Sequence, residues 1–170
     1  MKWNKWIRYL LVLSCVLTIV FIFSNSLQDA TTSSSTSESV GDVVEDAVNN
    51  VVSGGTINRG DEGFIEIPDQ IIRNLAHIGE FVLLGFVMTL AFRSYGWRLG
   101  QVYFPALVST SVATTDELIQ LFVPGRSYEY LDLLLDYGGI AVGLALAVVL
   151  GYVILRPRQP LPDNQSKQPK

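Results

Sequence analysis

Residues 131–155 read LDLLLDYGGIAVGLALAVVLGYVIL, and only two charged side chains, Asp132 and Asp136, interrupt this apolar run. A helix needs about 20 mostly apolar residues to cross the hydrocarbon core of a bilayer. The apolar residues do not alternate with polar ones, so the stretch is typical of a helix and not of a half-buried strand. The run therefore predicts a transmembrane helix with two carboxylates near its start.

Three further stretches have the same character, at about residues 7–23, 74–92 and 102–122. Charged residues make up only 16% of the 170-residue chain, compared with about 25% in an ordinary soluble domain. We therefore predict an all-α, multi-pass membrane protein in which residues 1–155 form one four-helix transmembrane domain. The first stretch follows basic residues, as in a signal peptide, but no A-x-A-like cleavage site follows Phe23, so we expect it to remain as an anchor.

The basic residues predict the orientation, because they concentrate in cytoplasmic loops. With the N-terminus inside, nine of the 12 Lys and Arg residues are cytoplasmic. Both termini are then cytoplasmic, residues 24–73 form an external loop, and residues 156–170 form a tail that we expect to be disordered. The net charge of −4 argues against a nucleic-acid partner. We expect the protein to lie in a membrane, in contact with membrane lipid.

The external loop contains a valine-rich segment whose apolar residues recur with helical spacing. These residues are Val40, Val43, Val44, Ala47, Val48, Val51 and Val52. We expect an amphipathic helix that begins near Ser39 and stops at Gly54, preceded by a flexible Ser/Thr run at residues 31–37. Two interpretations stay open: a lid that packs its valines on the rim of the bundle, and a helix that docks a partner.

Ionisable side chains inside the predicted spans are the strongest functional signal, because each one costs roughly 2.5–3.5 kcal/mol at the bilayer centre. At 1.5 Å per residue, those in the spans lie about 1.5–9 Å below the outer helix ends. Each helix carries them on one edge, so the sequence predicts a polar cavity that opens to the outside. The predicted site residues are His77, Glu80, Asp116, Glu117, Gln120, Arg126, Asp132 and Asp136.

Five of these residues are acids, and carboxylates crowded in a low dielectric cannot all ionise unpaired. Either some are protonated or a divalent cation completes the site. Carboxylate oxygens suit Mg²⁺, Ca²⁺ or Mn²⁺, and a histidine would also allow Zn²⁺. The candidate metal ligands are Asp116, Glu117 and Asp132, with Asp136 in place of Glu117 in an enzymatic interpretation, and the candidate general bases are Glu80 and Glu117.

Purely structural interpretations exist for the same residues. His77 has Glu80 one turn further along the predicted helix as a hydrogen-bond partner. Arg126 has Asp132 as an ion-pair partner or the outer headgroups as its environment. Asp116 and Gln120 are suitable residues for interhelical hydrogen bonds.

The chain resembles the VanZ-like family of small bacterial membrane proteins, whose named member is associated with resistance to the glycopeptide antibiotic teicoplanin. The similar stretches are Phe23-Ser24-Asn25-Ser26 with Gln28, Arg73 to Phe81 with Gly85, Asp116 to Gln120 with Pro124-Gly125-Arg126, and Asp132, Asp136, Gly139 and Gly143. The chain departs from the family pattern at Asn74, Ile78 and Phe81, where Lys, Phe and Tyr are usual. The resemblance implies a protein of the bacterial cytoplasmic membrane that acts at its outer face and lowers glycopeptide susceptibility, but it implies no known reaction.

Three functions compete on the sequence alone. The first is a protein without established catalytic activity that binds an envelope precursor, a lipid headgroup or the glycopeptide itself. The second is a metal-dependent membrane enzyme that acts on a lipid-linked cell-wall precursor, although no nucleophile is distinguished. The third, ion or proton transport, ranks last because the residues after Asp136 in the last helix are almost entirely apolar.

Overall fold

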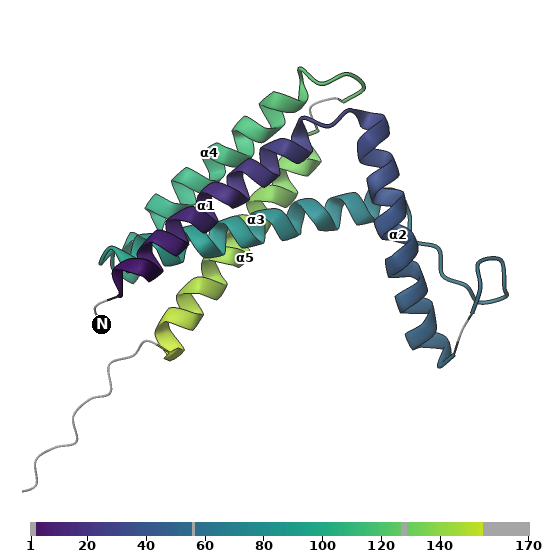
Figure 1. Cartoon of the computed structure of the whole chain (residues 1–170), viewed down its shortest axis with the longest axis horizontal. Helices are drawn as coiled ribbons and strands as arrows, with labels where there is room; N and C mark the ends of the chain where they lie inside the picture. The colour runs from purple at the N-terminus through teal and green to yellow at the C-terminus, as the bar shows by residue number, and fades with distance from the viewer. Residues whose placement is uncertain (1–2, 56, 127–128, 155–170) are drawn as a thin grey trace, which may run out of the picture.

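A computed structural model describes residues 3–55, 57–126 and 129–154, and every regular element in these ranges is a helix (Figure 1). The expected all-α fold is therefore confirmed. The elements are α1 (Lys5–Ser26), α2 (Ala30–Ser53), α3 (Asp69–Ser94), the short 3₁₀ helix η1 (Leu99–Gln101), α4 (Tyr103–Gln120) and α5 (Tyr130–Ile154). The predicted disordered tail at 156–170 lies outside the described residues.

Three of the described helices are long and apolar enough to cross a membrane, namely Lys5–Ser26, Asp69–Ser94 and Tyr130–Gly151. The predicted span at 102–122 corresponds to α4. This helix is not among the three, because its mean hydropathy is lower than theirs. α3 begins at Asp69, five residues before the predicted Asn74, because Pro68 precedes the helix and Asp69 favours its first turn. Sequence patterning placed this start too late because the first turns of α3 are polar.

The central packing contact is the crossing of α3 and α5, where glycines let the two backbones meet. A Cβ atom on Gly85 of α3 would lie 2.7 Å from the Ile140 carbonyl oxygen, and one on Gly139 of α5 would lie 2.7 Å from the Ile78 carbonyl oxygen. Gly143 packs against Val82 in the same way. The pair of glycines four residues apart on α5 thus permits the close approach that their spacing predicted.

Apolar side chains from α1, α3, α4 and α5 fill the space around this crossing. The buried members are Cys15, Ile22, Phe81, Leu84, Val87, Met88, Ala91, Ala113 and Ile140. Large apolar side chains on the outward sides of these helices are exposed, among them Leu13, Leu17, Leu107 and Leu146. An exposed apolar perimeter around a packed core is typical of helices that face lipid.

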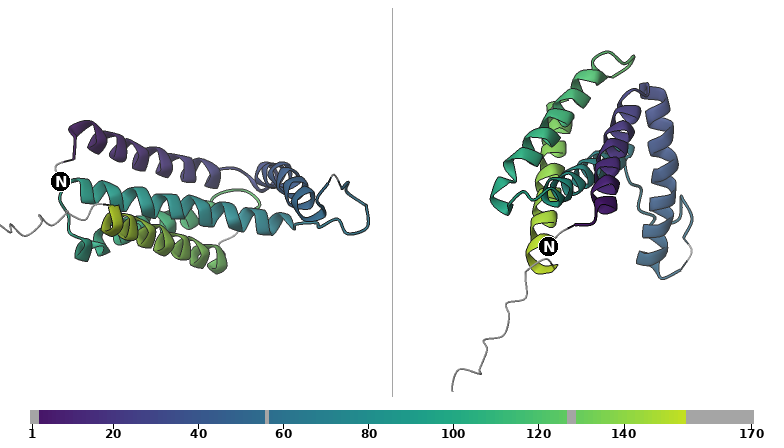
Figure 2. Two further views of the ribbon diagram at one scale, coloured as in Figure 1. Left: turned by 90° about the horizontal axis from the view of Figure 1, so that it is seen from below. Right: turned by 60° about the vertical axis from the view of Figure 1, so that its left-hand side comes forward.

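α2 lies beyond the end of α1 and crosses the first part of α3, as the left view of Figure 2 shows. The segment 31–37 was expected to be flexible, but it is helical. Asp29 caps the helix by accepting a hydrogen bond from the Thr32 N–H at 2.7 Å, and hydroxyls further along bond back to the helix, such as Thr36 to the Thr32 carbonyl at 3.0 Å. The expected stop is confirmed, because Gly54 adopts φ 67°.

The polar side of α2, and not its valine side, packs against the rest of the chain. Val43, Val51 and Val52 are exposed, whereas Glu45 and Asn49 are buried. The Asn49 amide donates to the Ile65 carbonyl at 2.9 Å and accepts from the Ile65 N–H at 2.8 Å. The lid interpretation therefore does not hold for Val43, Val51 and Val52, although Val44 and Val48 are half-buried. Backbone hydrogen-bonding groups of the following loop take the polar face instead.

Glu45 completes this arrangement, which we call the α2 clasp. In it, Asp42, Glu45 and Asn49 of α2 bind Arg59 and the backbone of residues 65–67. The Glu45 carboxylate accepts from the Ile67 N–H at 2.7 Å and pairs with Arg59, which also binds Asp42 at 2.6 Å. These contacts hold the loop between α2 and α3 against α2.

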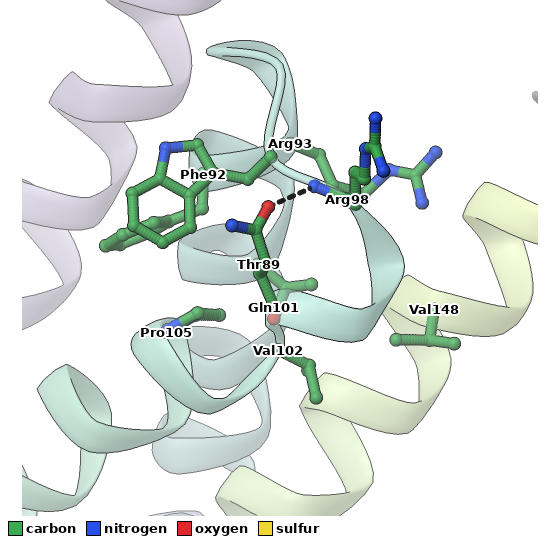
Figure 3. A pocket seen from close by; sticks show the side chains of 9 residues that line it. Thr89, Phe92, Arg93, Arg98, Gln101, Val102, Pro105 and Val148 are labelled. Carbon is green, nitrogen blue, oxygen red and sulfur yellow. Dashed lines mark hydrogen bonds between the residues drawn. The ribbon is translucent and has the colours of Figure 1, made fainter.

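Basic and aromatic side chains gather at the end of the bundle where α1 and η1 begin, which we call the basic end. Arg8 lies over the Tyr95 ring at 5.5 Å. A small pocket beside η1 has Arg93 and Arg98 on its wall, and the Arg98 N–H donates to Gln101 at 2.8 Å (Figure 3). Its volume of about 10 Å³ has room for about one water molecule, so it is no candidate ligand site.

Candidate functional site

The candidate site lies at the opposite end of the bundle, where α1 and α4 end and α3 and α5 begin (Figure 1). We call this the polar end. Two residues of α1 connect to the other helices here. The Asn25 amide donates to the Glu80 carboxylate of α3 at 2.7 Å, and the Ser26 hydroxyl donates to the Asp116 carboxylate of α4.

Two pairs join α3 to α5 at the same end. Arg73 lies 3.3 Å from the Asp132 carboxylate, and the His77 Nδ1 lies 3.3 Å from the Asp136 Oδ1. The alternative in which His77 hydrogen-bonds Glu80 is not observed between these two described residues. The Glu80 carboxylate accepts from Asn25 instead. Arg73 takes the position beside Asp132 that was one of the two alternatives for Arg126.

α4 presents three buried polar side chains to this end. Asp116, Glu117 and Gln120 are each at most 3% exposed. The Gln120 amide donates to Glu117 at 3.3 Å and to Asp116 at 3.4 Å, and the Glu129 N–H donates to the second Glu117 oxygen at 3.4 Å. Glu117 is therefore enclosed within the protein.

A cavity of about 320 Å³ opens beside this network, between α1, α3 and the first half of α2. Its floor carries His77 and Glu80, and the hydroxyls of α2 form one wall. The lining residues are Phe21, Asn25, Ser26, Gln28, Ser33, Thr36, Ser37, Val40, Arg73, Ala76, His77, Glu80 and Arg126. The segment 31–37, which the sequence placed in a flexible linker, thus covers the cavity.

Arg126 reaches the cavity from the turn between α4 and α5. Its Nη2 donates to the Asn25 carbonyl at 3.4 Å, while its Nε is buried without a hydrogen-bond partner. Burial and the neighbouring positive charge of Arg73 lower the pKa of Arg126. Arg73 and Arg126 both line the cavity, but Arg73 is paired with Asp132 and Glu129, and the Glu80 carboxylate also lines it. Among the described residues, the Arg126 guanidinium has no carboxylate within ion-pair distance.

The structure brings all eight predicted site residues to the polar end and adds three that the prediction omitted, Asn25, Ser26 and Arg73. Asn25 and Ser26 lie at the very end of α1, where a polar residue is expected for simple exposure, so their types carry little information. Their best signal was the resemblance of residues 23–26 to a family motif. Arg73 precedes the predicted start of its helix and was therefore assigned to the external loop.

These features define a class: an all-helical protein with three described helices of membrane-spanning length and a buried polar network beside a cavity at one end of its bundle. The family model described as VanZ/LLP1 matches residues 9–152. The chain therefore belongs to the VanZ/LLP1 family. No curated protein and no solved structure matches the chain.

Proposed function

We propose that the chain crosses the bacterial cytoplasmic membrane four times and that its polar end faces outward. α4 carries exposed apolar side chains such as Leu107 and Leu118 and ends beside α1 at the polar end, so a span by α4 supports this topology. The basic end is then cytoplasmic, in agreement with the tendency of Lys and Arg to remain inside.

A cysteine-labelling experiment tests this orientation. In a Cys15→Ser background, a cysteine at Glu62 should react with a membrane-impermeant maleimide in intact cells, whereas one at Gly100 should react only after permeabilisation. Both positions are exposed, so accessibility within the protein does not differ between them. Labelling of Gly100→Cys in intact cells would contradict the proposed topology.

We further propose that the cavity binds the anionic headgroup of an envelope lipid or of a lipid-linked cell-wall precursor. The observation that carries this proposal is the Arg126 guanidinium, which lines the cavity beside Arg73 and has no carboxylate ion-pair partner among the described residues. Guanidinium groups match phosphate and carboxylate geometry. A volume of about 320 Å³ is at the low end for ligand pockets, which favours a headgroup over a whole glycopeptide antibiotic.

Binding at this site would lower susceptibility to teicoplanin-type glycopeptides by altering access to a precursor at the outer face. The test expresses the chain in a sensitive host and compares wild type with Arg126→Gln and the exposed control Arg98→Gln, at equal membrane levels. We expect wild type and Arg98→Gln to reduce teicoplanin susceptibility and Arg126→Gln to lose the effect. Unchanged susceptibility with wild type in the membrane would refute the resistance role.

Headgroup binding has its own readout. Purified protein should retain phosphatidylglycerol in preference to phosphatidylcholine when the two are offered in mixed micelles, measured by native mass spectrometry. Arg126→Gln should lose this preference and Arg98→Gln should keep it. Equal retention of the two lipids by wild type would contradict an anionic headgroup site.

A second candidate is a membrane-embedded enzyme that acts on a lipid-linked envelope substrate, and one observation favours it. Of the two candidate general bases, Glu80 lines the cavity, whereas Glu117 is fully buried and does not. A base must reach its substrate, so Glu80 is the better candidate. If lipid extracts from cells with wild type and Glu80→Gln contain the same precursors in the same amounts, the enzymatic alternative is wrong.

A further inference from the structure

Three side chains from three different helices converge beneath the cavity: His77 of α3, Asp116 of α4 and Asp136 of α5. One ligand atom from each lies within 4.8 Å of the other two. Among the described residues, this is the one group of three or more His, Cys, Asp and Glu side chains that meets this distance. Asp116 and Asp136 are at most 1% exposed.

The relation between His77 and Asp136 fits two ligands of one ion better than a hydrogen-bonded pair. The His77 Nδ1 and the Asp136 Oδ1 lie 3.3 Å apart, yet neither atom has a hydrogen-bond partner of acceptable geometry. Zinc bonds of roughly 2.0–2.1 Å to nitrogen and oxygen at a tetrahedral angle place the two ligand atoms about 3.4 Å apart. The observed 3.3 Å between the His77 Nδ1 and the Asp136 Oδ1 is close to this distance between two zinc ligands.

Asp136 supplies the second, independent observation. Its side chain is fully buried, and both of its carboxylate oxygens lack a hydrogen-bond partner. A buried carboxylate is strongly unfavourable unless it is paired or coordinates a metal. Ser26 and Gln120 donate hydrogen bonds to Asp116, as outer partners of metal-binding carboxylates do.

The other acids at the polar end already have partners. Asp132 pairs with Arg73, Glu80 accepts from Asn25, and Glu117 accepts from the Glu129 N–H and from Gln120. Asp132 keeps one buried oxygen, Oδ1, without a hydrogen-bond partner, but neither Asp132 nor Glu117 belongs to the group of three. Of the candidate ligands taken from the sequence, Asp116 and Asp136 belong to it.

We propose that His77, Asp116 and Asp136 bind one divalent transition-metal ion, with Zn²⁺ as the best match to one imidazole and two carboxylates. Three protein ligands leave a fourth position open, as in zinc sites that bind a water or a ligand. Because His77 also lines the cavity, an anionic headgroup there would lie near the ion. This last step rests on the proposed headgroup site; metal binding itself does not.

The test uses the full chain, purified in detergent with an affinity tag that contains no histidine. After incubation with Zn²⁺ and desalting, elemental analysis should find about one zinc per chain. After removal of zinc with a chelator, a titration with Co²⁺ should produce the visible absorption of a four-coordinate site. His77→Gln and Asp136→Asn should weaken Co²⁺ binding at least tenfold, since each removes a ligand.

Two further variants make the result specific. Asp46→Asn changes an exposed acid of α2 in the same way and should retain full zinc content. Glu117→Gln should also retain the ion, whereas the alternative ligand set of Asp116, Glu117 and Asp132 predicts its loss. Size-exclusion chromatography and circular dichroism establish that each variant is folded.

Folded wild type that holds no zinc, or His77→Gln and Asp136→Asn that bind Co²⁺ as tightly as wild type, would overturn the metal site. Loss of zinc in Glu117→Gln with retention in His77→Gln would also overturn it. A metal-free protein that still prefers phosphatidylglycerol refutes this inference and leaves the proposed function intact. A zinc-loaded protein that retains the two lipids equally supports the metal site and refutes the proposed headgroup site.

Discussion

Gly143 of α5 packs directly against the backbone carbonyl of Val82 in α3, and no side chain fits between the two helices at this point. Alanine here would force α3 and α5 apart, and overpacking of this kind destabilises by about 1–3 kcal/mol. We expect Gly143→Ala to lower the thermal unfolding midpoint in detergent. It should also weaken the polar end, because the pairs formed by Arg73 and His77 with α5 depend on the same crossing.

Gly138 provides the matched control for this prediction. It belongs to the same helix, but a Cβ atom placed on it would meet nothing within 4 Å. Gly138→Ala should therefore leave stability unchanged or raise it by up to about 1 kcal/mol through helix propensity. Equal effects of the two substitutions would show that the close crossing does not determine stability.

A second prediction concerns the contact between Ser26 and Asp116, which are 90 positions apart in the chain. Ser26→Ala removes a hydrogen bond to a buried carboxylate, which we expect to destabilise the protein by about 1–3 kcal/mol. Ser24→Ala is the control, since Ser24 is exposed and its hydroxyl bonds only to the Val20 carbonyl of its own helix. Chemical unfolding of the two variants should separate them, and a larger loss for Ser24→Ala would contradict the contact.

The sequence predicted the parts of this fold that depend on hydrophobicity and on residue size. Long apolar runs predicted the helices, and the spacing of Gly139 and Gly143 predicted a close crossing. The polar residues inside the predicted spans pointed to the end of the bundle where the structure gathers them. These properties are local, so one sequence is enough to recognise them.

The partners within the polar end were not predictable in the same way. Which acid meets Arg73, and whether His77 faces Glu80 or Asp136, depends on the rotation of each helix about its axis. That rotation is set by contacts such as Gly143 with Val82, which involve the backbone of a distant segment. Helical spacing alone makes Glu80, one turn away, a possible partner of His77, whereas the structure places His77 beside Asp136 and Glu80 beside Asn25.

The orientation of α2 illustrates the same limit. Its valines predicted an apolar buried face, but an extended loop segment offers unpaired backbone groups that Glu45 and Asn49 satisfy. A buried polar group is tolerated when it is fully hydrogen-bonded, and the sequence pattern does not reveal which loop will supply the partners. Val43, Val51 and Val52 are consequently exposed, while Val44 and Val48 are half-buried.

Asn49 makes a third prediction possible. Its amide both donates to and accepts from the backbone of Ile65, so Asn49→Ala should release the loop from α2. Hydrogen exchange of the Ile65 amide should accelerate about tenfold or more, because loss of about 1.4 kcal/mol corresponds to one factor of ten. Asn50→Ala, at the exposed neighbouring position, should leave this rate unchanged. Unaltered exchange in Asn49→Ala would mean that the clasp does not hold the loop.

The last prediction concerns pH and the α2 clasp. The ion pair with Arg59 and the hydrogen bond from the Ile67 N–H lower the pKa of Glu45 below its ordinary value of 4.5. A carboxyl group whose pKa is lower in the folded state stabilises that state above its unfolded pKa, and the stabilisation is lost as the pH falls through the folded value. The clasp should therefore stay closed at pH 4.5 and open only under more acidic conditions.

The Ile67 amide is the direct reporter of this transition, because its N–H donates to Glu45 at 2.7 Å. In NMR spectra of the detergent-solubilised chain, its resonance should titrate with a midpoint below pH 4.5. Arg59→Gln should move the midpoint upward, since it removes the group that contributes most to the lowered pKa. Glu62→Gln, an exposed change in the same loop, should not move it. A midpoint that Arg59→Gln leaves unchanged would rule out the ion pair as the cause, and the clasp would then depend on its backbone hydrogen bonds alone.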